Sequence, residues 1–305
     1  MHYYNIYVFI FFIIIAAAAA VIKQPAIAAK MASSGRPSRH LYYTAITLAG
    51  FAIAHRQVPL QSGPFTAHLS ASILLINMLF AGSMALNNLH DRAIDAVNEK
   101  NNSYSTVSVS KVCLPVIIAL FGLSVCLAAL VSYAVAAVTA CVILVGFAYS
   151  SPPARLKRFF PVNIIVIAAS TVLALALGYT CGSGSRGLEG FPWLFAASIL
   201  AGTAMSFNTK DVNDYKGDKK YGIQTLMTLL GPANGRAATA LLAFCGYMTV
   251  SAFSGSEIVT AAGIILGLAT SALVYMSKKR LNEPVIFTLF FLFTAVFAYV
   301  NPYSF

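Results

Sequence analysis

The sequence predicts an all-α protein, a polytopic bundle of transmembrane helices. Three observations support this fold class: 59% of the 305 residues are hydrophobic, only 10% are charged, and the mean hydropathy is +0.78. Lipid offers the backbone no hydrogen-bond partners, so long apolar stretches must satisfy their peptide groups internally. Helices do this within one segment, and we therefore expect helices rather than strands throughout.

Ten apolar stretches are long enough to cross the hydrocarbon core, which takes roughly 17 to 25 residues in a helix. Charged residues are concentrated in the connections that follow the odd-numbered stretches. In chain order the stretches are residues 4–22, 39–56, 67–90, 112–130, 132–150, 162–181, 191–209, 234–252, 257–276 and 284–302.

The lysines and arginines lie almost entirely in alternate connections. All but two of the 20, namely Arg56 and Arg186, follow the first, third, fifth, seventh and ninth stretches. Cationic loops stay on the cytoplasmic side, so we expect these connections to face the cytoplasm of a cell-membrane protein. The net charge of +11 then reflects topology and attraction to membrane lipid, and it does not imply a nucleic-acid partner.

The first apolar stretch differs from the others in its flanks. No lysine or arginine precedes it, and Lys23 follows it, which is the reverse of a secretory signal. Two interpretations remain open: an additional helix with its N-terminus outside, or an upstream start site where Met31 opens the functional chain. We therefore expect residues 1–30 to be an extra N-terminal segment and residues 31–305 to be the main domain.

All five aspartates of the chain fall in two short clusters. The first holds Asp91 and Asp95, and the second holds Asp211, Asp214 and Asp218. Clustered carboxylates beside a membrane cost free energy unless they are compensated, and a hard divalent cation is their usual partner. All five are therefore candidate metal ligands.

The spacing within each cluster predicts a shared helical face. Asn87, Asp91 and Asp95 recur every four residues at the end of the third stretch, and the three aspartates of the second cluster are spaced by three and four residues. Residues at such intervals lie on one side of an α-helix if the preceding helix continues through them. Asn87 and Asn208 would add neutral oxygen ligands or hold the carboxylates in place.

A basic stretch suggests what such a metal would bind. Tyr149 is followed by Arg155, Lys157 and Arg158, on the same side of the predicted membrane as both aspartate clusters. Lysine and arginine neutralise phosphate oxygens, and Mg²⁺ commonly binds through a few carboxylates plus substrate phosphates. The combination indicates a magnesium-bridged diphosphate, and its place in a membrane bundle suggests that the diphosphate carries a lipid tail.

These residues together resemble the UbiA superfamily of intramembrane prenyltransferases, over residues 36–305. The first motif of the family, an Asn followed by two Asp at four-residue steps, is matched by Asn87, Asp91 and Asp95. The second motif is matched by residues 210–218, from Lys210 through the three aspartates of the second cluster.

Two further elements extend the resemblance. Arg36-Pro37 is similar to the family's usual opening, and residues 149–158 resemble the Tyr and Lys element of the loop between its fourth and fifth helices. By likeness, Asn163 belongs with that element. The resemblance implies nine transmembrane helices around a central cavity, which makes residues 1–30 the surplus segment and residues 31–305 a UbiA-like prenyltransferase domain.

The resemblance also implies an activity. A polyprenyl group, such as geranylgeranyl, would pass from its diphosphate to a lipophilic aromatic or glycerol phosphate acceptor, with Mg²⁺ as cofactor and diphosphate released. No obligate protein partner is indicated. The implied catalytic residues are Asp91, Asp95, Asp214, Asp218 and Lys157; the metal ligands are Asp91, Asp95, Asp211, Asp214 and Asp218; the diphosphate-binding residues are Asn87, Tyr149, Arg155, Arg158, Asn163 and Lys210.

Two departures from the family pattern keep alternatives open. Asn88 stands where the family usually has an Asp, and residues 101–105 lack its Arg-Pro loop, which predicts weaker donor binding or a different donor. The missing arginine leaves a lipid-binding member without catalysis as one alternative, and the carboxylates of a membrane protein leave an ion-coupled transporter as another. A CDP-alcohol phosphotransferase is disfavoured, since its Asp-Gly and Ala-Arg signature is absent.

Overall fold

The computed structural model describes residues 2–33, 35–98, 107–277 and 280–300, and within these ranges the chain is helical with no strand. The all-α prediction is confirmed. The chain divides into two compact units: unit 1 comprises Met1–Arg155 and Leu173–Phe191, and unit 2 comprises Leu156–Val172 and Pro192–Phe305.

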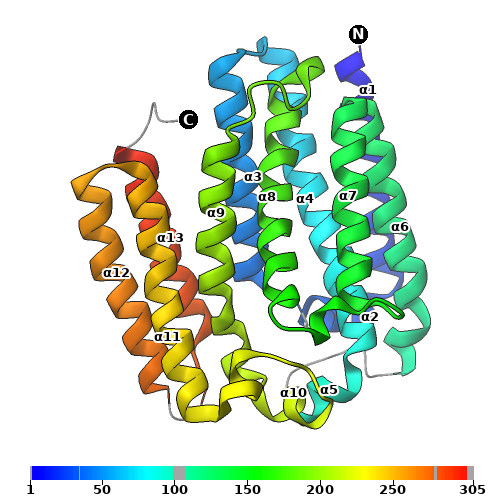
Figure 1. Ribbon diagram of the computed structural model, residues 1–305. Coiled ribbons are helices and arrows are strands. Elements are labelled where there is room, and N and C mark those ends of the chain that lie inside the picture. The colour runs from blue at the N-terminus through cyan, green and yellow to red at the C-terminus, as the bar shows by residue number, and fades with distance from the viewer. Residues whose placement is uncertain (1, 34, 99–106, 278–279, 301–305) are drawn as a thin grey trace. The chain divides into compact units, whose positions relative to one another are not determined.

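Unit 1 is a bundle of antiparallel helices in which α4 packs against α3, α6 and α7 (Figure 1). A short 3-10 helix, η3 (Gly184–Arg186), follows its last helical segment. Its α-helices are α1 (His2–Lys23), α2 (Pro25–Ser33), α3 (Pro37–Gln57), α4 (Ser62–His90), α5 (Arg92–Val97), α6 (Val107–Val131), α7 (Tyr133–Ser150) and the C-terminal part of α8 (Val162–Gly182).

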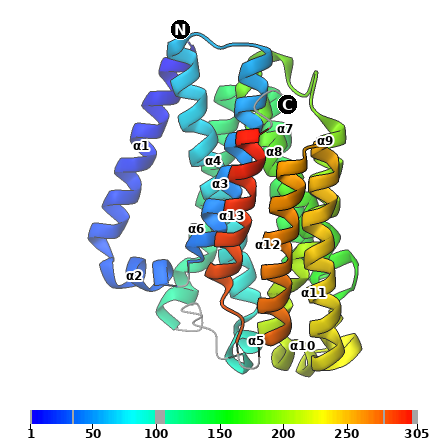
Figure 2. The same ribbon diagram turned by 90° about the vertical axis from the view of Figure 1, so that its left-hand side faces the viewer.

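Unit 2 is built on α11, which packs against α9 and α12, while α12 packs against α13; the last three helices lie side by side in Figure 2. The N-terminal part of α8 belongs to this unit. The other elements are η2 (Leu156–Arg158), α9 (Trp193–Ser206), η4 (Phe207–Asn213), α10 (Tyr215–Lys220), α11 (Leu226–Ser254), α12 (Glu257–Met276) and α13 (Glu283–Val300).

Eight helices in the described ranges are long and apolar enough to cross a membrane: α1, α4, α6, α7, α8, α11, α12 and α13. The two remaining predicted stretches, 39–56 and 191–209, are also largely helical, as α3 and α9. Helix α3 carries His and Arg at both ends, and α9 has only 14 residues before the backbone tightens into η4. The end of the tenth stretch, residues 301–302, lies outside the described residues.

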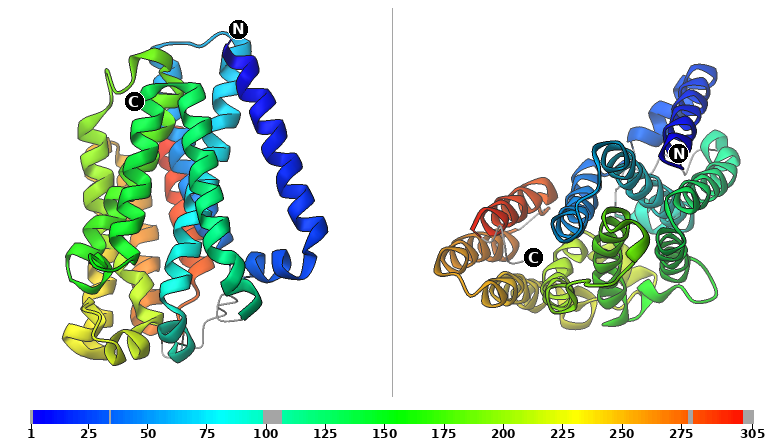
Figure 3. Two further views of the ribbon diagram at one scale, coloured as in Figure 1. Left: turned by 90° about the vertical axis from the view of Figure 1, so that its right-hand side faces the viewer. Right: turned by 90° about the horizontal axis from the view of Figure 1, so that it is seen from above.

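Helix α1 packs against α4 and α6. From the end of α1, α2 runs crosswise back toward the other helices of unit 1, where it contacts α6, as the left-hand view of Figure 3 shows. Ile6 is buried, and the Tyr7 hydroxyl hydrogen-bonds to the Thr66 hydroxyl. Most of the other α1 side chains are exposed and apolar, as expected for a helix that faces lipid. The separation of residues 1–30 from the rest stays a prediction.

Helix α3 and the C-terminal part of α8 touch backbone to backbone in unit 1. A Cβ atom added at Gly178 would lie 1.7 Å from the Thr47 carbonyl oxygen, and one at Gly50 would lie 2.0 Å from that of Leu175. No side chain fits in either place, so the two glycines permit this approach. Such close contacts between small residues are the usual way in which membrane helices associate.

Helix α11 begins eight residues before the predicted stretch because Thr225 caps it. The Thr225 hydroxyl accepts a hydrogen bond from the Thr228 N–H, and the Thr228 hydroxyl accepts one from the Thr225 N–H, which forms a capping box. The helix is then interrupted at Gly231, whose φ of 77° is outside the helical region, next to Pro232. Helix α11 packs against η4 and α10, the two short helices of the second aspartate cluster.

Candidate active site

The first aspartate cluster lies at a break between two helices of unit 1. The prediction that Asn87, Asp91 and Asp95 share one continuous helical face is wrong, because α4 ends at His90 and α5 begins at Arg92. Asp91 joins them with φ −100° and ψ 7°. Its N–H still donates to the Asn87 carbonyl at 2.9 Å, and the Asp95 N–H donates to the Asp91 carbonyl at 2.8 Å, so hydrogen bonds of helical spacing continue on both sides of the break.

Arg155 supplies a physical reason for the break. Its Nη2 donates to the His90 carbonyl oxygen and to Asp91 Oδ1, both at 3.2 Å. The last carbonyls of a helix have no partner within the helix, so a guanidinium at this point stabilises the helix end. The Arg155 backbone has φ 37°, a left-handed conformation that costs an L-residue roughly 1 kcal/mol, which the two side-chain contacts offset.

Replacing Arg155 with glutamine is expected to lower the free energy of unfolding by about 1–3 kcal/mol, because the partly buried Asp91 carboxylate loses a charged donor. Thermal unfolding of the purified protein in detergent would measure this. Arg186 is an exposed arginine of the same unit, so Arg186→Gln is the matched control and should change little. Equal effects of the two substitutions would contradict a stabilising role for the contact with Asp91.

The other predicted residues of unit 1 lie on elements next to this break. Asp91 and Asp95 are buried, and the Asn87 side-chain oxygen accepts a long hydrogen bond of 3.4 Å from the Ser150 hydroxyl at the end of α7. Tyr149 is half-buried in the last turn of α7. Unit 1 therefore brings Arg155 to Asp91 and the end of α7 to Asn87. Asn88, the departure from the family pattern, is buried in the last turn of α4.

The second aspartate cluster spans a 3-10 helix and a short α-helix of unit 2. The prediction of one continuous face for Asp211, Asp214 and Asp218 is also wrong, since α9 ends at Ser206 and is followed by η4 and then α10. Asp214 is the residue between η4 and α10. Asp211 and Asp218 are buried, and Lys210 pairs with Asp211 Oδ1.

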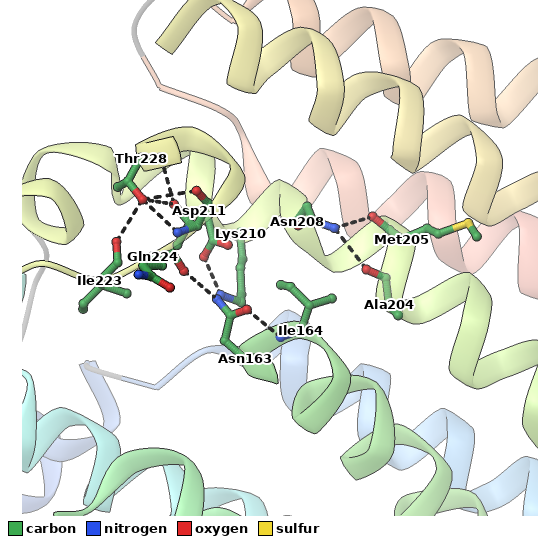
Figure 4. A network of polar contacts seen from close by, with 11 residues as sticks. Asn163, Ile164, Ala204, Met205, Asn208, Lys210, Asp211, Ile223, Gln224 and Thr228 are labelled. Carbon is green, nitrogen blue, oxygen red and sulfur yellow. Dashed lines mark hydrogen bonds and ion pairs between the residues drawn. The ribbon is translucent and has the colours of Figure 1, made fainter. Parts of the chain in front are cut away.

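Asn208 marks the end of α9 (Figure 4). Its Nδ2 donates to the carbonyl oxygens of Ala204 and Met205, at 3.0 and 2.9 Å, which lack the usual helical donors at this point. Both amide hydrogens are used in this way, so Oδ1 points away from the helix end. Within the described residues, this buried oxygen has no hydrogen-bond donor.

Two of the predicted basic and polar residues of unit 2, Arg158 and Asn163, contact Gln224 just before α11. Lys157 is buried in η2, whereas Arg158 is exposed and its carbonyl accepts a hydrogen bond from the Gln224 N–H at 2.9 Å. Asn163 is buried, and its Nδ2 donates to the Gln224 carbonyl at 3.4 Å (Figure 4). Gln224 therefore joins η2 and α8 to the segment that follows the aspartates.

The donor chemistry of these residues suits Mg²⁺. Among the residues that the structure describes, no three His, Cys, Asp or Glu side chains form a group that could hold a metal ion. Magnesium does not need such a cage, because it retains water and binds through one or two carboxylates plus substrate phosphates. The buried carboxylates and the Asn208 oxygen are hard ligands of the kind it prefers, so the residues fit this ion.

The sequence reasoning gave no role to Asn213, which hydrogen-bonds to the connection between α12 and α13. Gln224 follows the second motif in the sequence, and its backbone N–H and carbonyl make the contacts with Arg158 and Asn163. Asn213 lies inside the aspartate motif, which was the available signal. Its partner lies 68 residues later and carries no polar side chain, so the contact had no signature in the sequence.

Comparison with known proteins assigns the chain to a family. A sequence model described as the UbiA prenyltransferase family matches residues 43–296. The chain is 32% identical over 114 residues to a homogentisate phytyltransferase of Synechocystis, an alignment that covers 36% of this chain and 37% of that protein. It is 26% identical over 239 residues to the bacteriochlorophyll synthase 33 kDa chain of Cereibacter sphaeroides, which covers 70% and 72%.

A solved structure has the same fold. A UbiA homolog from Archaeoglobus fulgidus, bound to DMAPP and Mg²⁺, superposes with a TM-score of 0.65 and 21% identity, over 86% of this chain and 94% of that one. The chain spans little more than a third of the length of the homogentisate phytyltransferase it matches. The structural likeness therefore supports the fold, and the family match covers most of the chain.

Proposed function

Because the chain belongs to the UbiA prenyltransferase family, we propose that it transfers a polyprenyl group from its diphosphate to a lipophilic acceptor within the membrane. The observation that carries the proposal is the burial of carboxylates in both motif regions, Asp91 and Asp95 in one and Asp211 and Asp218 in the other. Buried carboxylates are costly in an apolar protein unless a cation compensates them. Arg155 already pairs with Asp91 and Lys210 with Asp211, and the Mg²⁺ of a magnesium diphosphate would add a divalent cation beside each group of carboxylates.

Each cluster contributes ligands to Mg²⁺, which when bound neutralises charge on the diphosphate leaving group. The metal ligands are Asp91, Asp95, Asp211, Asp214 and Asp218. The basic and polar side chains of each unit would hold diphosphate oxygens: in unit 1, Arg155 by charge and Asn87 and Tyr149 by hydrogen bonds; in unit 2, Lys157, Arg158 and Lys210 by charge and Asn163 by a hydrogen bond. Donors that are already in place stabilise the negative charge that develops on the diphosphate, because the side chains need not rearrange during the reaction.

The reaction breaks the bond between the first prenyl carbon and the diphosphate oxygen, and the electron pair leaves with diphosphate. The acceptor forms a new bond to that carbon and releases a proton. The allylic cation that develops must be kept from water, and apolar helices of the kind that this chain carries would provide surroundings with little water.

The acceptor is a lipophilic aromatic or glycerol phosphate compound. The names of two relatives, a homogentisate phytyltransferase and a bacteriochlorophyll synthase, support an aromatic or related ring acceptor. The name of the Archaeoglobus structure, with bound DMAPP and Mg²⁺, supports a prenyl diphosphate donor. The protein acts as an integral multi-pass protein of the cell membrane, with the aspartate-bearing side toward the cytoplasm, where the cations are concentrated.

The test uses the purified protein in lipid nanodiscs with geranylgeranyl diphosphate, with and without Mg²⁺. A panel of aromatic and glycerol phosphate acceptors is supplied, and mass spectrometry detects prenylated products alongside released diphosphate. We expect a magnesium-dependent product with one acceptor class. Binding of the prenyl diphosphate with no product from any acceptor would instead support a lipid-binding protein without catalysis.

A further inference from the structure

Asn213 lies between two proposed metal ligands of unit 2 and is held by a distant part of the chain. Its Nδ2 donates to the Leu281 carbonyl oxygen at 2.9 Å, and its Oδ1 accepts from the Leu281 N–H at 2.8 Å. The amide thus forms a reciprocal pair with one residue's backbone. Leu281 belongs to the connection between α12 and α13.

The neighbouring residue anchors the same turn by apolar contact. Val212 packs against a core cluster formed by Ala240, Val274 and Leu281, in which Leu281 is 5% exposed. Two successive side chains, one apolar and one polar, therefore attach η4 to the same connection. A turn fixed at two adjacent residues has little freedom to rotate.

The connection is itself attached to α11. Arg236 Nη1 donates to the Ser277 carbonyl oxygen at 2.8 Å, just after α12 ends. The described residues on both sides of positions 278–279 are therefore held, Ser277 by Arg236 and Leu281 by Asn213. Ser277 and Leu281 are thus two points at which the chain after α12 is attached to the rest of unit 2.

We propose that Asn213 is a positioning residue for the carboxylates of Asp211 and Asp214; this inference rests on the proposed function. The Asp214 N–H donates to the Asp211 carbonyl at 3.1 Å, so the two aspartates and Asn213 form one turn. Mg²⁺ demands nearly ideal octahedral geometry at short distances, so a small rotation of this turn weakens binding. Asn213 itself holds no metal, because its amide oxygen and nitrogen both engage Leu281.

Metal binding is the readout that separates positioning from simple stability. Mn²⁺ serves as a paramagnetic substitute for Mg²⁺, and the loss of its free signal in electron paramagnetic resonance reports binding to the protein in nanodiscs. Titrations are run with and without geranylgeranyl thiodiphosphate as a slowly reacting donor. Loss of an outer hydrogen-bond partner typically weakens metal binding or activity about 10–100-fold, and we expect a loss of that size for Asn213→Ala.

For Asn213→Asp, added charge and misplacement of the turn predict opposite changes in Mn²⁺ affinity. This variant keeps an acceptor for the Leu281 N–H, loses the donor to the Leu281 carbonyl and adds a negative charge to the cluster. Charge alone predicts tighter Mn²⁺ binding, whereas misplacement of the turn predicts weaker binding. We expect weaker binding, and tighter binding would overturn the proposal.

Thr270→Val is the matched structural control. Its hydroxyl donates to the Tyr247 hydroxyl at 3.1 Å, so the variant removes a buried hydrogen bond between α12 and α11 in the same unit. We expect a lower unfolding temperature with unchanged Mn²⁺ affinity. Equal weakening by Thr270→Val and Asn213→Ala would overturn the proposal, as would unchanged affinity in Asn213→Ala.

Asp214→Asn separates failure of this inference from failure of the proposed function. If Asp214→Asn binds Mn²⁺ as well as the unaltered protein does, the second cluster is no metal site, and both proposals fall. If metal binding depends on Asp214 and on Asn213 but no acceptor is prenylated, only the proposed reaction is wrong.

Discussion

Asp214→Asn is expected to lower the rate of prenyl transfer by about 10²- to 10³-fold, the usual effect of removing one group that stabilises charge in a transition state. Asparagine keeps the size of aspartate but not its charge, so the variant loses attraction for Mg²⁺ without creating a cavity. The measurement is product formation at saturating donor and acceptor, together with the unfolding temperature. We expect a large loss of rate at nearly unchanged stability.

Glu257→Gln is the matched control, because Glu257 is an exposed carboxylate of the same unit at the start of α12 and outside both clusters. It undergoes the same change of charge and should retain full activity. Asp91→Asn makes the corresponding test in unit 1 and should cause a loss of the same order. Full activity in both Asp91→Asn and Asp214→Asn would rule out the proposed role of the carboxylates.

Gly178→Ala is expected to destabilise the protein by about 3 kcal/mol or more, at or above the upper end of ordinary overpacking effects. The added Cβ would lie 1.7 Å from the Thr47 carbonyl oxygen, which is backbone and cannot rotate away. Helix α3 must therefore move from α8, and the adjacent contact at Gly50 opens with it. Thermal unfolding in detergent, followed by intrinsic fluorescence, would measure the loss.

Gly122→Ala is the matched control in the same unit. A Cβ added at Gly122, in α6, has nothing within 4 Å. Alanine favours helix over glycine by roughly 0.5–1 kcal/mol, so this variant should be as stable as the unaltered protein or slightly more so. If Gly178→Ala were as well tolerated as Gly122→Ala, the backbone contact between α3 and α8 would not hold unit 1 together.

The fold could be predicted because hydropathy alone distinguishes lipid-crossing helices from other segments. All ten apolar stretches occur largely as helices in the described residues, and the main errors are at their ends. The start of α11 depends on the Thr225 cap rather than on hydropathy, so an apolar scan placed it too late. Helix α9 stops early because Asn208 bonds to its last carbonyls, which the pattern of apolar residues does not record.

The candidate site was predicted in composition but not in geometry. Counting aspartates finds both clusters, since no other aspartates occur in the chain. The helix breaks at Asp91 and after Ser206 were missed, because spacing of three and four residues assumes a continuous helix. Arg155 reaches Asp91 from the loop that follows α7, and such a contact depends on tertiary structure. Residues 101–105, where the family's Arg-Pro loop is missing, lie outside the described residues.

The pairing of Asn213 with Leu281 has a consequence for how this protein can change in evolution. The bond uses only the peptide groups of Leu281, which every amino acid except proline presents. Substitution at position 281 is therefore limited by side-chain packing and not by the hydrogen bonds to Asn213. Substitution at position 213 removes those hydrogen bonds directly. The contact therefore depends on the side chain at one end only, and a substitution at position 213 has no compensating side-chain substitution at position 281.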